Sequence, residues 1–188
     1  MKIYFATGNK GKLEEMRPLF EERGYELVQL DVDVPEIDSM EIEEVARRKA
    51  IDSYKAWNGE DLLIVEDTGF FVESIGGFPG PEAALFAGTV GAEGLLKLME
   101  GNENREAYFK TGIACYHDGE VDVFSGEMHG KIPEEKRGES HPHLPYNSYF
   151  IPNDEDKSLA EDGDLKDERF HRRKAVLKFL EWLDNNKP

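Results

Sequence analysis

Apolar residues recur along the chain in spacings that predict a succession of strands and helices. Short apolar runs bounded by polar or turn residues are typical of buried strands. The predicted strands lie at residues 2–6, 26–30, 62–65, 107–116, 120–127 and 149–152. Apolar residues three or four positions apart are typical of amphipathic helices. The predicted helices lie at residues 12–23, 42–57, 91–99 and 164 to about 183.

This order of elements predicts an α/β domain with a mixed sheet. The two β-rich runs joined by His117-Asp118-Gly119 predict a hairpin, and the hairpin region is expected to form a second lobe. The chain shows no internal repeat and no linker long enough to separate domains, so residues 1–188 are interpreted as a single domain. A cleft between two lobes is a common place for a ligand.

Four local features refine this prediction. Pro18 is expected to weaken or kink the first helix. The segment Glu66-Asp67-Thr68-Gly69 is expected to close the strand at residues 62–65 as a turn, and residues 76–81 form a glycine-proline loop. Asp164 is expected to cap the last helix.

Composition and charge narrow the function. The 188 residues include 23 Lys and Arg against 40 Asp and Glu, which gives a formal net charge of −17. Such a surface repels nucleic acid and anionic lipid, so binding to either is not expected. The longest aliphatic run, residues 62–65, is far shorter than the roughly 20 residues that span a bilayer. The first residues lack a signal-peptide pattern, and the single cysteine, Cys115, excludes an intrachain disulfide, so a cytoplasmic protein is expected.

The acidic residues are spread along the whole chain rather than gathered in a tail. This distribution favours adaptation to high salt over an acidic docking surface. The few places where positive charge collects are therefore the informative ones for function.

One such place is Thr7-Gly8-Asn9-Lys10-Gly11-Lys12, between the first predicted strand and helix. Glycine lets the backbone approach a ligand closely, and a helix N-terminus offers unpaired N–H groups to an anion. Lys10 and Lys12 add positive charge. The segment is either a phosphate-binding turn or an ordinary strand–helix turn with exposed lysines, and it differs from the Walker pattern GxxxxGK[ST].

Carboxylates at the end of the strand at residues 62–65 are candidate metal ligands. Glu66 and Asp67 follow that strand, and neighbouring strand residues point to opposite faces, so at most one is expected to face a given ligand. Glu36 in the preceding loop could supply a second oxygen ligand for Mg²⁺. The alternative is that Glu66 and Asp67 only cap a turn.

Two basic features complete the candidate site. Lys49 lies on the apolar side of the predicted helix at residues 42–57, and it either extends to the surface or reaches into a cleft. The run Arg169-Phe170-His171-Arg172-Arg173-Lys174, preceded by Lys166, carries five basic residues in an acidic chain. It either pairs with neighbouring surface carboxylates or clamps an anionic substrate.

Taken together, these segments resemble the inosine triphosphate pyrophosphatase family. The similarity runs from Lys2 to the final helix. The matching segments are Thr7-Gly8-Asn9-Lys10-Gly11-Lys12 with Glu15 (the signature TGNxxKxxE), residues 44–50, Val65-Glu66-Asp67-Thr68-Gly69 and Gly76-Gly77-Phe78-Pro79-Gly80-Pro81. The resemblance implies hydrolysis of inosine, deoxyinosine and xanthosine triphosphates to monophosphate and pyrophosphate. It also implies a two-lobed α/β domain with a long mixed sheet flanked by helices, Mg²⁺ as cofactor and a homodimer.

The resemblance also implies roles for individual residues. Asp67 corresponds to a magnesium ligand and to the general base, and Glu36 to a second magnesium ligand. Lys12 is expected to offset charge that develops on the phosphates, and Glu66 is kept as a further candidate metal ligand. The residues expected to contact substrate are Thr7, Gly8, Asn9, Lys10, Lys12, Lys49, Thr68, Tyr146, Asn147, Lys166, His171 and Arg172.

The base-reading half departs from the family pattern. The family's Phe-Gly-Tyr/Trp-Asp segment appears here as Leu144-Pro145-Tyr146-Asn147. An aspartate only accepts hydrogen bonds when ionised, whereas Asn147 both donates and accepts. The matching motifs predict a Mg²⁺-dependent nucleoside triphosphate diphosphatase. The altered base segment leaves two alternatives, namely a relative that binds nucleotides with little hydrolysis and a pyrophosphatase for a different base.

Overall fold

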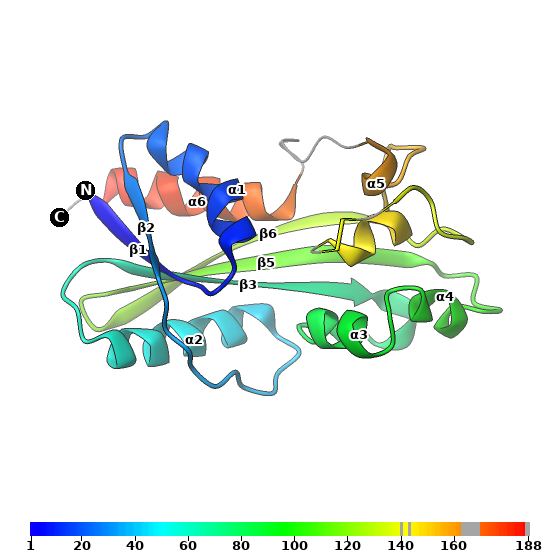
Figure 1. Cartoon of the computed structure of the whole chain (residues 1–188), viewed down its shortest axis with the longest axis horizontal. Helices are drawn as coiled ribbons and strands as arrows, with labels where there is room; N and C mark the ends of the chain where they lie inside the picture. Colours follow the sequence, from blue (N-terminus) through cyan, green and yellow to red (C-terminus); the bar gives the residue numbers. More distant parts are fainter. Residues whose placement is uncertain (140, 143, 163–169, 187–188) are drawn as a thin grey trace. The chain divides into compact units, whose positions relative to one another are not determined.

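The computed structural model describes residues 1–139, 141–142, 144–162 and 170–186. In these residues seven strands form one mixed sheet in the order β2-β1-β3-β5-β6-β7, with the short β4 paired to β3 (Figure 1). The chain divides into two compact units. The first comprises residues 1–68, 111–126 and the chain from 171 onward, and the second comprises 69–110 and 127–170. The predicted α/β class with a mixed sheet flanked by helices is confirmed.

The first unit is a layered α/β structure. Its elements are β1 (Lys2–Ala6), α1 (Lys10–Glu21), β2 (Glu26–Leu30), α2 (Ile42–Trp57), the first part of β3 (Leu63–Val72), parts of the hairpin strands β5 (Glu106–His117) and β6 (Glu120–Lys131), and α6 (His171–Asn185). Helices α1 and α6 cover one face of the strands and α2 covers the other (Figure 1). On β3, Ile64 packs in the α1–α6 core while Leu63 and Val65 pack against α2, so the strand is buried on both faces.

The second unit is built around an aromatic core. Its further elements are the 3₁₀ turn η1 (Glu73–Ile75), β4 (Pro79–Gly80), α3 (Ala83–Thr89), α4 (Gly94–Leu98), the 3₁₀ turn η2 (Pro145–Tyr149), β7 (Ile151–Pro152) and α5 (Leu159–Asp162). Phe70 on β3 and Phe109 on β5 pack with Tyr146 and Phe150, with ring centroids 4.6–6.5 Å apart. Aromatic rings at these separations bury much apolar area and stabilise the unit.

Some local predictions are wrong at specific places. The strand predicted at residues 62–65 continues to Val72, so Glu66 to Gly69 form no turn. Its charged residues stay in the strand because they meet oppositely charged side chains there. The first helix begins at Lys10 instead of Lys12 and continues through Pro18. Proline has no backbone N–H, so the helix lacks one hydrogen bond at this position.

Other differences concern the second half of the chain. Helix α3 was not predicted, because it spans only seven residues, AALFAGT, and buries only Ala83 and Phe86. The helix predicted at residues 91–99 is reduced to Gly94–Leu98. Helix α6 begins at His171, since Phe170 is not helical, while the predicted cap Asp164 lies outside the described residues. No helix among the described residues is both long and apolar enough to cross a membrane.

Candidate active site

Two candidate site residues of the first unit, Thr7 and Glu36, follow the carboxyl ends of the parallel strands β1 and β2, while Glu66 and Asp67 lie within β3. β1 pairs in parallel with β2 and with β3, where Phe5 lies beside Ile64. If this register is continued, Thr7 lies level with Glu66 on the next strand. Glu36 lies in the loop that follows β2. In α/β sheets ligands bind at such strand ends, so the topology itself gathers these side chains.

The turn after β1 is held in a fixed conformation by its own side chains. The Thr7 hydroxyl accepts a hydrogen bond from Asn9 N over 3.1 Å, and Asn9 Oδ1 accepts one from Lys12 N over 3.2 Å. Asn9 is therefore the N-cap of α1, as expected for this residue type. Gly8 and Lys10 are exposed in this turn. The exposed turn and the N-terminus of a twelve-residue helix present donors and positive charge to an anion.

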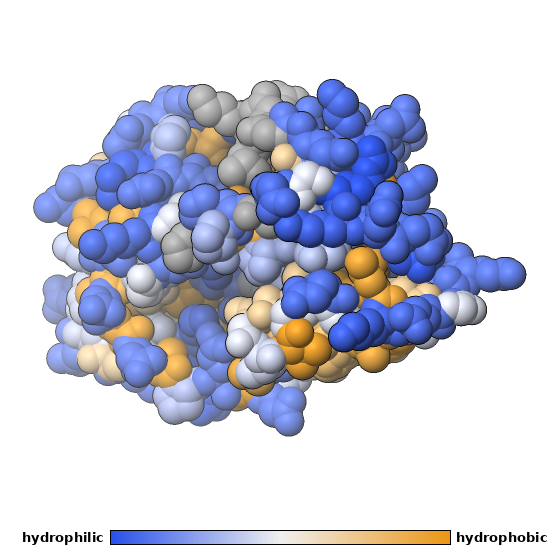
Figure 2. Space-filling model, turned by 45° about the vertical axis from the view of Figure 1, so that its right-hand side comes forward, coloured by the Kyte–Doolittle hydropathy of each residue, from blue (hydrophilic) through white to orange (hydrophobic). Residues whose placement is uncertain are grey.

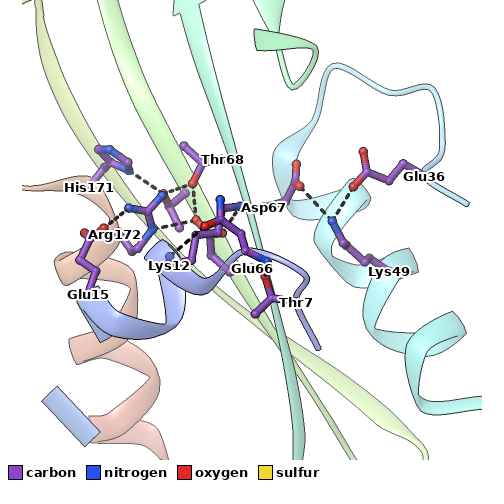
Figure 3. A network of polar contacts seen from close by, with 12 residues as sticks. Thr7, Lys12, Glu15, Glu36, Lys49, Glu66, Asp67, Thr68, His171 and Arg172 are labelled. Carbon is purple, nitrogen blue, oxygen red and sulfur yellow. Dashed lines mark hydrogen bonds and ion pairs between the residues drawn. The ribbon is translucent and has the colours of Figure 1, made fainter. Parts of the chain in front are cut away.

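Glu66 is a buried carboxylate held by cations from two helices (Figure 3). Its Oε2 contacts Lys12 Nζ of α1, and its Oε1 accepts hydrogen bonds from Arg172 Nε of α6, over 3.0 Å, and from the Thr68 hydroxyl. Burial by itself would raise the pKa of Glu66, but Lys12 and Arg172 outweigh burial and hold this pKa well below the usual value of a glutamate. Glu66 is therefore ionised, and both of its oxygens have partners.

Arg172 joins Glu66 to a second carboxylate. Its Nη1 lies 2.5 Å from Glu15 Oε2, and its side chain is only 8% exposed. Burial raises the pKa of Glu15, against the opposing effect of the Arg172 charge. Glu15 entered the sequence analysis only as part of a signature, and the structure shows what it contacts. Removing one member of such a buried ion pair leaves an uncompensated charge, which is strongly destabilising.

Asp67 belongs to a separate polar cluster, directed toward α2 (Figure 3). Lys49 Nζ lies 3.4 Å from Asp67 Oδ1 and 2.5 Å from Glu36 Oε1. Of the two interpretations of Lys49, the inward one therefore describes the structure. Burial raises the pKa of Asp67 to about 6, even though Lys12 and Lys49 act in the opposite direction. Burial alone would lower the pKa of Lys49, but the neighbouring carboxylates Asp67 and Glu36 raise it.

The two carboxylates beside Lys49 are suitable ligands for a hard cation. Glu36 and Asp67 direct oxygens to one positive group, the Lys49 ammonium. Within residues 1–139, 141–142, 144–162 and 170–186, no group of three or more His, Cys, Asp or Glu side chains is arranged to hold a metal ion. A two-carboxylate site nevertheless fits Mg²⁺, which usually keeps several waters and takes further oxygens from substrate phosphates.

A hydrogen-bonded row of side chains leads from Glu66 to His171. The Thr68 and Thr111 hydroxyl oxygens lie 2.6 Å apart, and Thr111 Oγ1 lies 2.6 Å from His171 Nδ1. Thr111 was missed in the sequence analysis. Its signal is a polar residue on the buried face of β5, in line with Phe109 and Ile113. Burial and the adjacent Arg172 charge lower the pKa of His171 well below its usual value.

Two residues of the predicted base-reading segment, Tyr146 and Asn147, belong to the second unit. Tyr146 and Asn147 lie in η2 of the second unit and are buried there. The Tyr146 ring stacks on Phe70 at 4.8 Å, and its hydroxyl donates to Ala83 O over 2.6 Å, so the hydroxyl is already bonded within its own unit. Lys166 lies outside the described residues.

Comparisons with known proteins agree on one family. A model of the Ham1 family matches residues 3–182. A protein named dITP/XTP pyrophosphatase from Methanopyrus kandleri is 43% identical over 99% of this chain and 98% of its own length. A second protein of that name, from Hyperthermus butylicus, is 42% identical over 96% and 94%. The solved structure of the Staphylococcus aureus Ham1 protein covers all of both chains with 29% identity and a TM-score of 0.83.

Proposed function

The chain belongs to the Ham1 family, and on this premise we propose that it hydrolyses non-standard purine nucleoside triphosphates, dITP and XTP among them, to the monophosphate and pyrophosphate. This is the activity for which the two relatives are named, and it agrees with the resemblance seen in the sequence. In a cell the reaction removes damaged nucleotides from the cytoplasmic pool. The observation that carries the proposal is that β3, just beyond the end of the parallel strand β1, pairs Glu66 with Lys12 and the neighbouring Asp67 with Lys49.

The turn after β1 is the proposed triphosphate site. Thr7, Gly8 and Asn9 supply backbone and side-chain groups before the N-terminus of α1, while Lys10 and Lys12 supply positive charge. Lys12 has a fixed position because its ammonium contacts the buried Glu66. A preorganised cation of this kind stabilises charge that develops on the phosphates during reaction.

Glu36 and Asp67 are the proposed ligands of Mg²⁺. When bound, the ion would neutralise phosphate charge and lower the pKa of a coordinated water. Glu66, a candidate ligand in the sequence analysis, is left out of this proposal because its two oxygens are held by Lys12, Arg172 and Thr68. Lys49, which contacts both Glu36 and Asp67, would turn to the phosphate chain when substrate arrives.

Asp67 is the proposed general base. A water attacks the α-phosphorus, the bond from the α-phosphorus to the bridging oxygen breaks, pyrophosphate leaves, and the proton of the water passes to the Asp67 carboxylate. The pKa of about 6 that burial gives this group suits the role, since a general base works best with a pKa near the operating pH. Lys12 and Lys49 neutralise part of the charge on the leaving pyrophosphate.

Recognition of the base is proposed to involve Thr68, His171 and Arg172 of the first unit. The contacts expected of Tyr146, Asn147 and Lys166 stay predictions from the family resemblance. The Tyr146 hydroxyl is bonded to Ala83 O, so a contact of Tyr146 with a base would use its ring. Because Asn147 stands where the family pattern has aspartate, a shift toward another base is the specific alternative to dITP and XTP.

The second unit also carries the surface proposed for a homodimer. Large apolar side chains are exposed around α3 and α4, where Figure 2 shows hydrophobic residues gathered in an otherwise largely hydrophilic surface. The exposed fractions are 41% for Phe78, 62% for Leu85, 57% for Val90 and 48% for Leu98. Exposed apolar side chains of this kind are proposed as the dimer interface, and replacing Leu85 and Val90 by Asp should yield a monomer in light scattering.

Product analysis tests the activity. The purified protein is incubated with ITP, dITP, XTP, GTP, ATP and pyrimidine triphosphates, with Mg²⁺ or with a chelator, at low and at molar salt. Pyrophosphate released fastest from ITP, dITP or XTP supports the proposal, and release from another base moves the substrate but keeps the reaction. Tight nucleotide binding without pyrophosphate release would replace the proposed hydrolysis by a nucleotide-binding function. Equal pyrophosphate release with Mg²⁺ and with a chelator would exclude the metal from the reaction.

A further inference from the structure

Four buried or partly buried side chains of the first unit form an unbroken row of hydrogen bonds. The row runs from the Glu66 carboxylate through the Thr68 and Thr111 hydroxyls to His171 Nδ1. In Figure 3 dashed lines mark these links, and Glu66, Thr68 and His171 are labelled. Thr111 is fully buried and His171 is 3% exposed, so water does not replace the link between these two residues.

One end of the row has a fixed hydrogen-bonding character. Glu66 contacts two cations, Lys12 Nζ and Arg172 Nε, and an ionised carboxylate only accepts hydrogen bonds. The Thr68 hydroxyl must therefore donate its proton to Glu66. The direction of this first link follows from charge alone.

The remaining directions follow because a hydroxyl carries one proton. Thr68 has used its proton on Glu66, so the Thr111 hydroxyl must donate to Thr68 Oγ1. Thr111 then has no proton left for His171, and the 2.6 Å link is a hydrogen bond only if His171 Nδ1 donates. The ring is neutral, because burial and Arg172 disfavour its charged form, so Nε2 carries no proton.

We propose that Thr68 and Thr111 are positioning residues that transmit the acceptor character of Glu66 to His171 and fix its ring as the Nδ1–H tautomer. Nε2 is then an acceptor toward any donor that lies against it. Where His171 meets the nucleotide, a consequence that rests on the proposed function, Nε2 accepts from an N–H of the purine and does not donate to its carbonyl oxygen. Thr111 thereby acts on base selection without touching the substrate.

The tautomer is measured directly by ¹⁵N NMR of histidine-labelled, nucleotide-free protein near pH 7.5. The chain has five histidines, and a His171→Gln variant identifies the His171 signals by their loss. The expected result is a neutral ring protonated at Nδ1. In Thr111→Val the Nδ1–H would lose the Thr111 oxygen as its acceptor, so its signal should be lost and replaced by that of the Nε2–H form.

Matched variants separate the row from general effects of substitution. Thr89→Val removes a hydroxyl that bonds only within α3 and should leave the His171 signals unchanged. Thr111→Ser keeps the hydroxyl and should retain the Nδ1–H form, and Thr68→Val repeats the test if Thr111→Val does not fold. An Nε2–H or doubly protonated ring in the unaltered protein, or an unchanged tautomer in both valine variants, overturns the proposal.

Kinetics with ITP and ATP provide a second readout. Thr111→Val should lower the ratio of kcat/KM for ITP over ATP, whereas Thr89→Val should not. The tautomer is determined without nucleotide, so a protein that releases no pyrophosphate but shows the Nδ1–H form refutes the proposed function and leaves this inference standing.

Discussion

The ammonium of Lys49 lies 2.5 Å from the carboxylate of Glu36, which stands 13 residues earlier in the chain. Glu36 is carried by the loop between β2 and α2, and its side chain is 57% exposed. Lys49 also lies 3.4 Å from Asp67, so it is a positive group between the two proposed magnesium ligands. A divalent ion bound to both carboxylates competes with this ammonium for the same oxygens.

Replacing Lys49 should therefore strengthen metal binding in the absence of nucleotide. Lys49→Met removes a like charge at contact distance, which is worth a few kcal/mol at an effective dielectric of about 20, so Mn²⁺ should bind roughly tenfold tighter or more. Electron paramagnetic resonance titration with Mn²⁺ measures this constant. Arg48→Met is the control, because Arg48 lies on the same helix but pairs with Asp52. Equal affinity in the two variants would contradict the prediction.

Asp67→Asn should abolish most of the activity and leave the fold intact. Loss of a general base lowers turnover by roughly 10²–10⁴-fold, and loss of a metal ligand adds to this. Pyrophosphate release under saturating Mg²⁺ measures the effect, with circular dichroism as the check on folding. The control Asp61→Asn makes the same chemical change at an exposed position just before β3 and should retain full turnover. Near-native turnover in Asp67→Asn would remove Asp67 from the mechanism.

The pKa of Asp67 also predicts a pH-dependent stability difference in metal-free protein. Burial raises this pKa from 3.8 to about 6, so between these values the folded state holds the proton more tightly than the unfolded state. The contribution of the protonated Asp67 carboxyl to the free energy of unfolding is complete below about pH 4 and is lost as the pH rises through 6. Asp67→Asn escapes this loss, so it should match the unaltered protein near pH 4 and exceed its free energy of unfolding by on the order of 1–2 kcal/mol at pH 7.5.

Urea denaturation in chelator at several pH values measures this difference. Comparing the two proteins at each pH cancels the contributions of other groups, including His171, whose lowered pKa makes stability fall as the pH drops below 6.5. If Asp67→Asn is less stable than the unaltered protein at pH 7.5, ionisation of the buried Asp67 does not destabilise the fold and the prediction is wrong.

Arg172→Met should destabilise the first unit strongly. It leaves the buried Glu66 with Lys12 alone and Glu15 without its guanidinium, and breaking such a pair costs about 3–5 kcal/mol. Chemical denaturation measures the loss. Arg23→Met breaks an exposed pair with Asp184 and should cost about 1 kcal/mol or less.

The double variant Glu66→Gln with Arg172→Met completes this test. Because the two residues share one interaction, it should lose less stability than the sum of the two single changes. Additive losses would mean that Arg172 and Glu66 stabilise the fold independently.

Elements with a strong local pattern were predicted with their bounds. The strands Lys2–Ala6 and Glu26–Leu30 and the helix Ile42–Trp57 agree with the sequence analysis residue for residue. Each has a run of apolar residues whose spacing matches one secondary structure only. Local spacing decides such elements because one of their faces must be buried whatever they pack against.

Elements that depend on distant partners were not predicted correctly. β3 continues through Glu66 and Asp67 to Val72, although adjacent charged residues and Gly69 favour a turn in isolation. Lys12 and Arg172 neutralise Glu66, and β4 pairs with β3 at Phe70 and Phe71. These contacts join residues up to 106 positions apart, so no local window contains them.

The sequence by itself determined the α/β class and the family, because these follow from apolar spacing and short motifs, and it predicted the residue types proposed to bind a metal-bound polyphosphate. The tertiary structure alone decided how those residues are paired. It directs Lys49 to Glu36 and Asp67, engages Glu66 with Lys12 and Arg172, and places Thr111 beside His171. The physical reason is that ionisation and hydrogen-bond direction depend on burial and on distances of a few ångströms, which only the folded chain sets.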